Sequence, residues 1–339
     1  MDAGFKLPRV DDYEPFIGAD AVARLKDKAR ALRGLRVVHM SSTYYGGGVA
    51  EMLAPLTLLM SSLGIPTEWR LVRGTPEFFG FTKALHNALQ GGAVQPSQWR
   101  SGVYEQVACE NAARNPLEDD RDVVVVHDPQ PLALIEHCSK RAPWVWRCHI
   151  DLSAPDPLAW SYVRRFIERY DAAIFSCPQY AQDLRLPQRF MLPAIHPFSP
   201  KNRELDAGAV DRCLARHGIP TDLPLVVQVS RFDRWKDPRG VIEAFRIVRE
   251  HVDATLVLLG NFAPDDPEGE AVYRELLALR EPRVLVLACD MPRIGEALPA
   301  GGHAFGEVRI LGREAVPIGP PLGKHQLLQC QQQVGASQQ

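Results

Sequence analysis

The stretch that most restricts the fold of this chain joins a short apolar run to an amphipathic helix through three consecutive glycines, Gly46 to Gly48. Residues 35–40, before the glycines, are typical of a buried strand. Apolar residues then recur at helical spacing from Val49 to Leu63, and Gly64 ends the run. A strand, a glycine turn and a helix form the first unit of a doubly wound α/β domain, in which ligands bind beyond the carboxyl ends of the strands.

The glycines have two interpretations. Glycine lets a backbone approach a ligand that a Cβ would exclude, and a helix N-terminus offers N–H groups to an anion or to sugar hydroxyls. Glu51, in the first helical turn, then accepts hydrogen bonds from sugar hydroxyls, or it only complements the helix dipole. The alternative for the glycines is a tight turn that binds nothing. An NAD-dependent oxidoreductase is disfavoured, because Gly46 to Gly48 lack the G-x-G-x-x-G spacing.

The chain continues with the same alternation of strand and helix. A helix over residues 21–32, capped by Asp20, precedes the first strand. The most continuous β-branched run, 122–127, is typical of a central parallel strand and is followed by a proline turn that begins another helix. The other predicted strands are 67–72, 144–151, 172–176 and 189–192, with helices from Pro76 to Asn87 and over 96–114.

A second series of strands and helices follows three prolines in residues 193–200, which we interpret as an interdomain linker. Its strands are predicted at 223–230, 254–259 and 283–288, and its helices begin at Pro238, behind an Asp237 N-cap, and near Glu268. Beyond Asp290 the alternation stops and the chain ends rich in glutamine. We therefore expect an N-terminal domain over 1–192, a linker over 193–204, a partial second domain over 205–290 and a poorly packed tail over 291–339.

Charge and cysteine content exclude several classes of protein. The net charge is −2 with no basic block, which argues against nucleic acid or an anionic membrane as the main partner. No apolar run approaches the roughly 20 residues of a membrane span, and the first residues lack a signal-peptide core, so a cytoplasmic protein is expected. The seven cysteines form no C-x-x-C pair, which favours reduced, mostly buried thiols over zinc ligands or disulfides.

Two cations follow the first strand of the second series. Arg231 and Lys236 precede a helix N-terminus, and this placement suits a diphosphate, which a guanidinium binds bidentately and an ammonium binds as a point charge. If a phosphate leaves during reaction, these charges stabilise it most in the transition state. A solvated charged loop with Asp233 and Asp237 is the alternative.

Two consecutive apolar strands end in a histidine and aspartate pair: His127 with Asp128, and His149 with Asp151. Carboxyl ends of parallel strands meet at one edge of a sheet, so both pairs are expected on the edge that also carries the glycine turn. Each pair also has a structural explanation. His149 can be a core histidine beside a helix cap at Asp151, and Asp128 can bond its own backbone in a proline turn.

Several segments, taken in order, resemble one known family. They are residues 41–51, Glu77 to Asn87, His127 to Gln130, Arg147 to Asp151 and Ser230 to Asp237. Over roughly residues 20–290 the chain resembles the trehalose synthase (glycosyl-transferring) and trehalose phosphorylase group of retaining GT-B glycosyltransferases. The resemblance implies an α/β fold with two Rossmann-like domains facing a cleft. It also implies reversible transfer of an α-glucosyl unit between a nucleoside diphosphate, or phosphate, and glucose, without a catalytic metal or other cofactor. The implied partners are nucleoside-diphosphate glucose or glucose 1-phosphate, glucose and trehalose.

The resemblance also assigns roles to single residues. Arg231 and Lys236 correspond to the catalytic pair that holds the donor phosphate. Gly47, Gly48 and Glu51 fall in the glycine-rich loop beside the cleft. His149 and Asp151 fall on the strand end that faces the sugars, and Asp128 is a further binding candidate. Such transfers need charge stabilised on the leaving phosphate and sugar hydroxyls held in place, and no protein nucleophile is implied.

The C-terminal segment departs from the family, which carries two glutamates with seven residues between them after the last matched strand. Here Glu296, Glu307 and Glu314 follow that strand, and no two of them have this spacing. We hypothesise that the reading frame shifts, or the chain is truncated, near residues 289–291. A catalytically inactive sugar- or nucleotide-binding remnant is therefore the alternative to an active enzyme. An incomplete second domain would expose apolar surface and favour association, for example as a homodimer.

Overall fold

The computed structural model describes residues 7–45, 47–93, 100–117, 122–199, 202, 204–262, 266–289 and 308–310, and the statements below concern these residues. The chain forms two compact units, which are considered separately. Unit 1 consists of residues 1–203 with 264–267, and unit 2 of residues 204–263 with 268–339.

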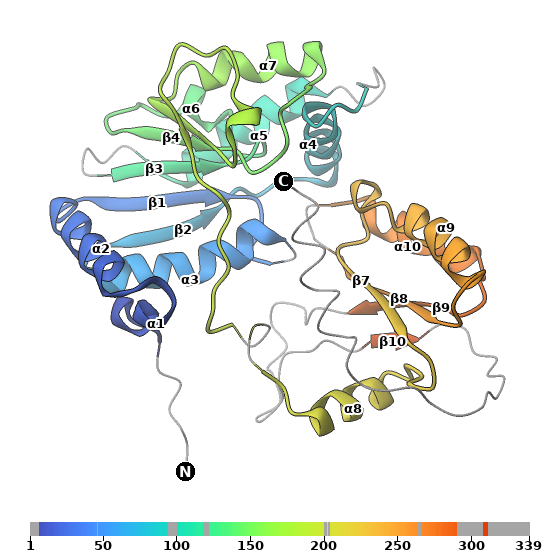
Figure 1. Ribbon diagram of the computed structural model, residues 1–339. Helices are drawn as coiled ribbons and strands as arrows, with labels where there is room; N and C mark the ends of the chain where they lie inside the picture. The colour runs from blue at the N-terminus through green and yellow to red at the C-terminus, as the bar shows by residue number, and fades with distance from the viewer. Residues whose placement is uncertain are drawn as a thin grey trace. The chain divides into compact units, whose positions relative to one another are not determined.

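Unit 1 contains a six-stranded sheet in which every pairing is parallel, in the order β2-β1-β3-β4-β5-β6 (Figure 1). Its strands are β1 (Arg36–Ser41), β2 (Thr67–Leu71), β3 (Asp122–His127), β4 (Trp144–Arg147), β5 (Ala172–Phe175) and β6 (Gln188–Phe190). Its helices are α1 (Glu14–Ile17), α2 (Ala19–Ala31), α3 (Gly48–Ser62), α4 (Pro76–Leu89), α5 (Ser101–Arg114), α6 (Leu134–His137) and α7 (Pro157–Ile167), with 3-10 turns η1 (Val10–Tyr13) and η3 (Pro178–Tyr180). This is the doubly wound α/β arrangement expected from the sequence.

The two faces of this sheet are covered by different helices, because side chains alternate along each strand. Val38 and Val124 belong to the large apolar cluster that also contains residues of α4, α5 and α7, among them Phe81, Tyr104 and Phe166. Val37 and Val123, each one position earlier on its strand, point to the other face of the sheet. There, Val37 lies in a cluster with Ala29 of α2, and Met60 and Leu63 of the α3 segment pack against it. Burial on both faces explains why these strands are continuously apolar.

Side-chain caps fix where several helices begin. Thr75 accepts a hydrogen bond from the Phe78 N–H at the start of α4, and Asp156 accepts from the first turn of α7. The expectation for α2 was wrong in one respect. Its N-cap is Gly18, whose φ of 80° places it in the left-handed region, and Asp20 lies inside the first turn. Glycine enters that region without strain, so the chain turns into the helix before reaching the aspartate.

One strand is shorter than predicted. The apolar run 144–151 suggests a strand ending in Asp151, but β4 ends at Arg147. The reason is a change of hydrogen-bond partner, because the backbone N–H of His149 donates to the Asp128 carboxylate at 2.8 Å. His149 and Asp151 therefore lie in the loop after the strand. The proline turn after β3 is also longer than expected, since α6 begins only at Leu134.

Unit 2 has a four-stranded sheet in the order β10-β9-β8-β7. The first three strands in the sequence are parallel to one another, and β10 pairs antiparallel with β9. The elements are β7 (Leu225–Val229), β8 (Thr255–Asn261), β9 (Val284–Cys289) and β10 (Val308–Ile310), with helices α8 (Ala207–Arg216), α9 (Pro238–Arg249) and α10 (Gly269–Ala278) and the 3-10 turn η5 (Arg234–Lys236). The strand β10 lies in the tail for which no regular structure was expected. The remaining tail, including the predicted break at residues 290–291, lies outside the described residues.

Strand β7 lies at the edge of this sheet, and part of it is poorly covered. Val229 is 72% exposed and Val227 is 44% exposed, and α8 has no buried residue. The apolar core of the unit lies among β8, α9 and α10 and contains Phe245, Leu256 and Val272. The described part of unit 2 thus exposes apolar side chains on its first strand.

The prediction of mostly buried thiols was wrong for the side chains that the structure describes. All five are free thiols, but only Cys148 is buried, whereas Cys109 and Cys213 are exposed. Cys109 lies in α5 and Cys213 in α8, and a surface helix turns one of its faces to solvent. Among the described helices, none is both long and apolar enough to cross a membrane.

Tyr104 ties the core of unit 1 to the turn after β3. Its buried hydroxyl donates to the Pro129 carbonyl at 2.6 Å and accepts from the Ala133 N–H at 3.2 Å. Tyr104→Phe should lower the free energy of unfolding by about 1–3 kcal/mol, because two backbone groups lose their partner in the core. The matched control is Tyr162→Phe, whose hydroxyl donates to the more accessible Glu105 and should cost less than about 1 kcal/mol. Urea unfolding measures both, and equal losses would contradict this role for Tyr104.

Candidate functional site

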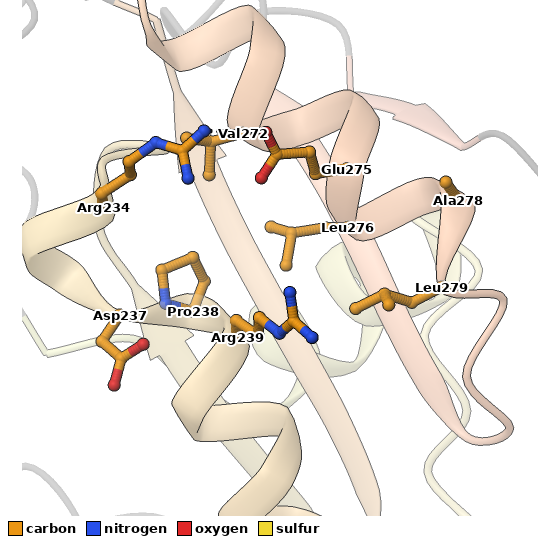
Figure 2. Close-up of a pocket in the computed structure, with 9 residues that line it drawn as sticks. All are labelled: Arg234, Asp237, Pro238, Arg239, Val272, Glu275, Leu276, Ala278 and Leu279. Carbon is orange, nitrogen blue, oxygen red and sulfur yellow. Dashed lines mark hydrogen bonds and ion pairs between the residues drawn. The ribbon is translucent and has the colours of Figure 1, made fainter.

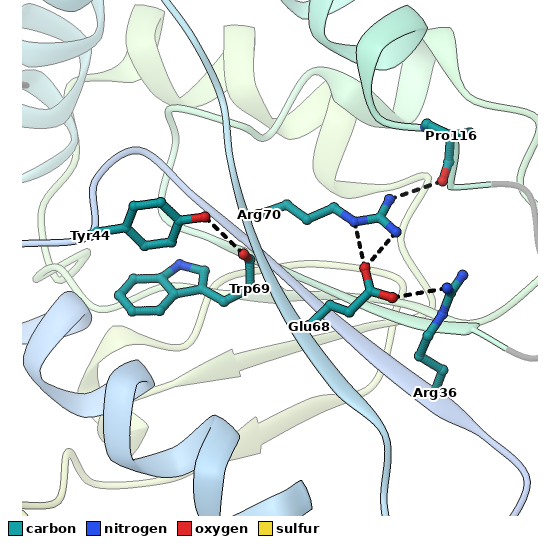
Figure 3. Close-up of polar contacts among 6 residues, drawn as sticks. All are labelled: Arg36, Tyr44, Glu68, Trp69, Arg70 and Pro116. Atoms are coloured by element: carbon teal, nitrogen blue, oxygen red, sulfur yellow. Dashed lines mark hydrogen bonds and ion pairs between the residues drawn. The ribbon is translucent and has the colours of Figure 1, made fainter. Parts of the chain in front are cut away.

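The turn between β1 and α3 is held against strand β2 (Figure 3). The Tyr44 hydroxyl donates to the Trp69 carbonyl at 3.0 Å, and the two rings meet edge to face at 4.7 Å. The Trp69 indole N–H in turn donates to the Ser41 hydroxyl at 2.7 Å. These contacts fix the path of the chain as it leaves the carboxyl end of β1.

The neighbouring residue on β2 carries an ion-pair network. Glu68 accepts from Arg36 of β1 at 2.9 Å and from Arg70 at 2.6 Å (Figure 3). Burial raises the pKa of Glu68, but the hydrogen bond and charge of Arg70, with a smaller contribution from Arg36, lower it overall. Arg70 also donates to the Pro116 carbonyl. The network therefore joins β1, β2 and the end of the α5 segment.

Gly47 and Gly48 are not required by the fold itself. Gly47 is the N-cap of α3 in an extended conformation that any residue adopts, and Gly48 is the first helical residue. A Cβ added at either position meets no atom within 4 Å. The tight-turn explanation therefore does not account for these two glycines, whereas Gly46 lies outside the described residues. Glu51 is exposed in the first turn, and its backbone N–H donates to the Gly47 carbonyl.

Three histidines form a hydrogen-bonded chain across the middle of the sheet. His39 Nδ1 lies 2.9 Å from His127 Nε2, and His127 Nδ1 lies 2.9 Å from His149 Nε2. They come from β1, from the last position of β3 and from the loop after β4, which are neighbours in the sheet. His39 and His127 are buried, and His149 is partly buried. The chain of histidines thus runs from the interior of unit 1 toward the carboxyl edge of its sheet.

All three rings are held in the neutral form. Burial lowers the pKa of His39 to about 4. The pKa of His127 lies well below its ordinary value, because of burial first and then of the neighbouring His39, His149 and Arg147. Burial also lowers the pKa of His149, although the nearby Asp128 opposes the shift. Near neutral pH each ring therefore carries one N–H and one lone pair.

Asp128 has a strained backbone and a defined partner. Its φ is 61°, which is uncommon outside glycine and is tolerated best by Asn and Asp. Its carboxylate accepts from the His149 backbone N–H at 2.8 Å, and its carbonyl accepts from the Trp146 indole at 3.1 Å. Asp128 therefore bonds the next loop rather than its own turn. Asp151 accepts from the Ser153 N–H at 2.7 Å, and the cap of α7 is Asp156.

The predicted cation pair lies on the loop after β7 in unit 2. Nη2 of Arg231 lies 3.7 Å from the carboxylate of Asp233, which is buried and caps η5 by accepting from the Trp235 N–H. Lys236 ends η5, and its carbonyl accepts from the Gln228 side chain at 2.7 Å. The Lys236 ammonium forms no ion pair with any residue in the described ranges. Asp237 then caps α9, as predicted, by accepting from the Gly240 N–H.

A surface pocket lies on the helical flank of the same unit (Figure 2). It encloses about 410 Å³ between the start of α9 and α10. Arg234 pairs with Glu275 there at 2.8 Å, and Arg239 and Asp237 add charges of opposite sign. The remaining lining is mostly apolar and includes Leu276. Neither Arg231 nor Lys236 lines this pocket, so it is distinct from the predicted phosphate site.

His39 is the residue of this edge that the sequence analysis missed. It lies within an apolar strand, two residues before the strand ends, and a single histidine there resembles any core histidine. The signal that could have revealed it is repetition, because β1, β3 and the segment after β4 each carry a histidine near the same edge. Among the described residues, no group of three or more His, Cys, Asp or Glu side chains is arranged to hold a metal ion.

Comparison with known proteins relates the chain to one family. Residues 39–182 match the model of the trehalose synthase N-terminal domain. A trehalose synthase of Pyrococcus horikoshii is 43% identical over 273 residues, which are 79% of this chain and 66% of that protein. The trehalose synthase of Rubrobacter xylanophilus is 39% identical over 266 residues, 76% of this chain and 64% of the relative. The chain thus spans about two thirds of the length of these relatives.

More distant matches extend the comparison. A trehalose phosphorylase of Pleurotus pulmonarius is 27% identical over 331 residues, which are 82% of this chain and 44% of that protein. Among solved structures, a trehalose-6-phosphate synthase superposes with a TM-score of 0.54 at 13% identity, over 76% of this chain and 74% of the other. This structural likeness concerns the fold, which is the GT-B class of α/β glycosyltransferases.

Proposed function

The chain belongs to the trehalose synthase and trehalose phosphorylase group of GT-B glycosyltransferases, and we propose that it transfers an α-glucosyl unit with retention between a nucleoside diphosphate, or phosphate, and glucose. The product in one direction is trehalose. The proposed partners are therefore nucleoside-diphosphate glucose or glucose 1-phosphate, glucose and trehalose.

The observation that carries this proposal is the edge at the carboxyl ends of β1, β3 and β4. Three central parallel strands bring together a helix N-terminus with two open glycines and the outer end of a neutral histidine chain. Neutral imidazoles and backbone N–H groups are suited to hydroxyls, which carry no charge. Asp128 and Asp151 lie in the two adjoining loops. This set of groups supports a sugar-binding role for Gly47, Gly48, Glu51, His149, Asp128 and Asp151.

The proposed role of the loop after β7 is to hold the donor phosphate. Transfer of a glucosyl unit passes through an oxocarbenium-like state while negative charge builds on the departing phosphate. Arg231, held near the buried Asp233, and the ammonium of Lys236 would stabilise that charge without a metal ion. We assign no protein nucleophile, and sugar-binding residues would hold the acceptor hydroxyl beside the reacting carbon.

The test is to incubate the purified chain with nucleoside-diphosphate glucose and glucose, and separately with trehalose and inorganic phosphate. Trehalose in the first reaction, or glucose 1-phosphate in the second, supports the proposal and distinguishes synthesis from phosphorolysis. A panel of uridine, adenosine and guanosine diphosphate glucose identifies the nucleotide. Absence of product in both reactions, with glucose binding retained in calorimetry, would overturn it in favour of an inactive binding protein.

Gly48→Ala separates a ligand role of the glycines from a folding role. The added methyl meets no protein atom, and alanine is a better helix residue than glycine, so stability should stay equal or rise by about 0.5–1 kcal/mol. Binding of nucleoside-diphosphate glucose should weaken by about tenfold or more, because the methyl occupies space that the ligand needs. Gly80→Ala, an equally open glycine within α4, is the control. Equal binding by both variants would show that Gly48 does not approach the ligand.

A further inference from the structure

The histidine chain has an inner end and an outer end. At the inner end, Nε2 of His39 is buried and has no hydrogen-bond partner among the described residues. At the outer end, Nδ1 of His149 forms no hydrogen bond to any residue that the structure describes. Between them, each of the two 2.9 Å contacts needs one N–H and one lone pair. A neutral chain of three rings therefore has only two arrangements, with every proton pointing outward or every proton pointing inward.

The buried end selects between these arrangements. If the protons point inward, His39 carries an N–H on Nε2, where no described group accepts it. If they point outward, only a lone pair is left there, and an unpaired buried N–H is rarer in proteins than an unpaired acceptor. In the outward arrangement, His39 Nδ1–H donates to His127 Nε2, and His127 Nδ1–H donates to His149 Nε2. His149 then carries its own proton on Nδ1.

We propose that His39 and His127 are positioning residues that fix His149 in the tautomer with its proton on Nδ1, so that His149 donates a hydrogen bond to a ligand oxygen. The ring planes of His127 and His149 are nearly parallel, 13° apart, and the ring centroids are 5.2 Å apart. With 2.9 Å between the two nitrogens, the rings meet edge to edge, as a hydrogen bond between them requires. The backbone of His149 is held separately, by the Asp128 carboxylate. Ring and backbone are thus fixed by different partners, which is the arrangement that orients a side chain for function.

The charged groups around the three histidines do not reverse the assignment of the Nδ1–H tautomer to His149. Arg147 at the end of β4 is buried and donates to the Met191 carbonyl at 2.6 Å. Its positive charge disfavours a second proton on His127 or His149. The Asp128 carboxylate has the opposite effect on His149, but the cost of burial remains larger. A donor that is neutral rather than cationic suits a sugar hydroxyl, and this identification of the ligand rests on the proposed function.

The test reads the tautomer directly. Nitrogen-15 NMR of protein labelled at histidine distinguishes Nδ1–H from Nε2–H rings, and single variants assign the signals. The wild type should show Nδ1–H for all three rings at pH 7. His39→Asp replaces the donor with an acceptor for a His127 Nε2–H, so both contacts should reverse and the tautomer ratio at His149 should change by about tenfold toward Nε2–H, roughly the worth of one hydrogen bond. His39→Asn keeps an N–H donor at this position and should retain the wild-type pattern.

Several results would overturn the proposal. They are an Nε2–H ring at His149 in the wild type, an unchanged His149 signal in His39→Asp, or an Nε2–H ring at His149 in His39→Asn. His217→Phe, at the end of α8 in unit 2, is the control and should remove one signal without altering the others. None of these readouts requires turnover. A chain that makes no trehalose yet shows the predicted tautomers would reject the proposed function and leave this inference standing.

Discussion

Arg231→Ala is expected to lower the rate of glucosyl transfer by about 100- to 1,000-fold, which is the usual effect of removing one group that stabilises charge in a transition state. Its guanidinium lies on the loop after β7, 3.7 Å from a buried carboxylate that restricts where it can point. Lys236 lies on the same loop but supplies only a point charge, and an ammonium does not replace a planar guanidinium. Glucose binding should stay near that of the wild type, because no sugar-binding candidate lies on this loop.

The control for this variant is Arg274→Ala. Arg274 is an exposed arginine of the same unit that pairs with Glu270 one turn earlier on α10, and its loss should leave the rate unchanged. Initial rates over a range of donor concentrations separate an effect on turnover from one on donor affinity. Equal rates for wild type and Arg231→Ala would mean that the loop is a solvated charged segment. The proposed phosphate site would then have to be abandoned.

Acidification from pH 7 to pH 4 should lower the free energy of unfolding by about 3 kcal/mol through His39 alone. The pKa of His39 is about 4 in the folded chain and about 6.5 in an unfolded one. Between these values the unfolded state binds the extra proton, so stability is full above about pH 6.5 and falls as the pH decreases toward 4. His127 and His149 have lowered pKa values as well and act in the same direction.

The variant His39→Phe isolates the contribution of His39 protonation to the loss of stability in acid. It cannot take up the proton, so its stability should fall less steeply over the same pH range, whatever its stability at pH 7. Urea unfolding at half-unit steps from pH 7.5 to pH 4 measures the two slopes. Arg147 and Asp128, the charged residues nearest the three histidines, are present in both proteins. The difference in slope therefore reports proton uptake by the histidines. Parallel curves would show that the His39 proton is not excluded from the folded state.

Much of the fold follows from local pattern. The β-branched run 122–127 is a central strand, as its composition indicated, and the spacing of apolar residues after the glycines marks α3 within one residue. The strand was predictable because burial on both faces of the sheet leaves a continuous apolar run. The helix was predictable because its apolar residues recur at helical spacing. The end of β4 was not predictable, since it depends on a carboxylate 21 residues away in sequence that captures the His149 N–H. The predicted start of α2 was wrong because the chain already turns into the helix at Gly18, so Asp20 lies within the first turn and does not cap it.

The candidate edge was predicted in part. Histidines at the ends of two apolar strands pointed to it, since parallel strands must align their carboxyl ends. The hydrogen-bonded chain was not predictable, because it depends on which strand lies beside which and on the rotation of each ring. His39 in particular has no distinguishing sequence neighbour. Its significance comes from β3 lying next to β1.

The histidine chain also links protonation to the order of events in folding. His39 and His127 are 88 residues apart in sequence, so their contact forms only when β1 and β3 pair, and such distant pairing is slow. In mild acid the unfolded histidines are cationic and must each release a proton before the strands can close. Refolding jumps to pH 5 should therefore be slower than jumps to pH 7, and the imidazole signals should appear together with the pairing of the central strands. The three rings can thus serve as a built-in reporter of sheet assembly.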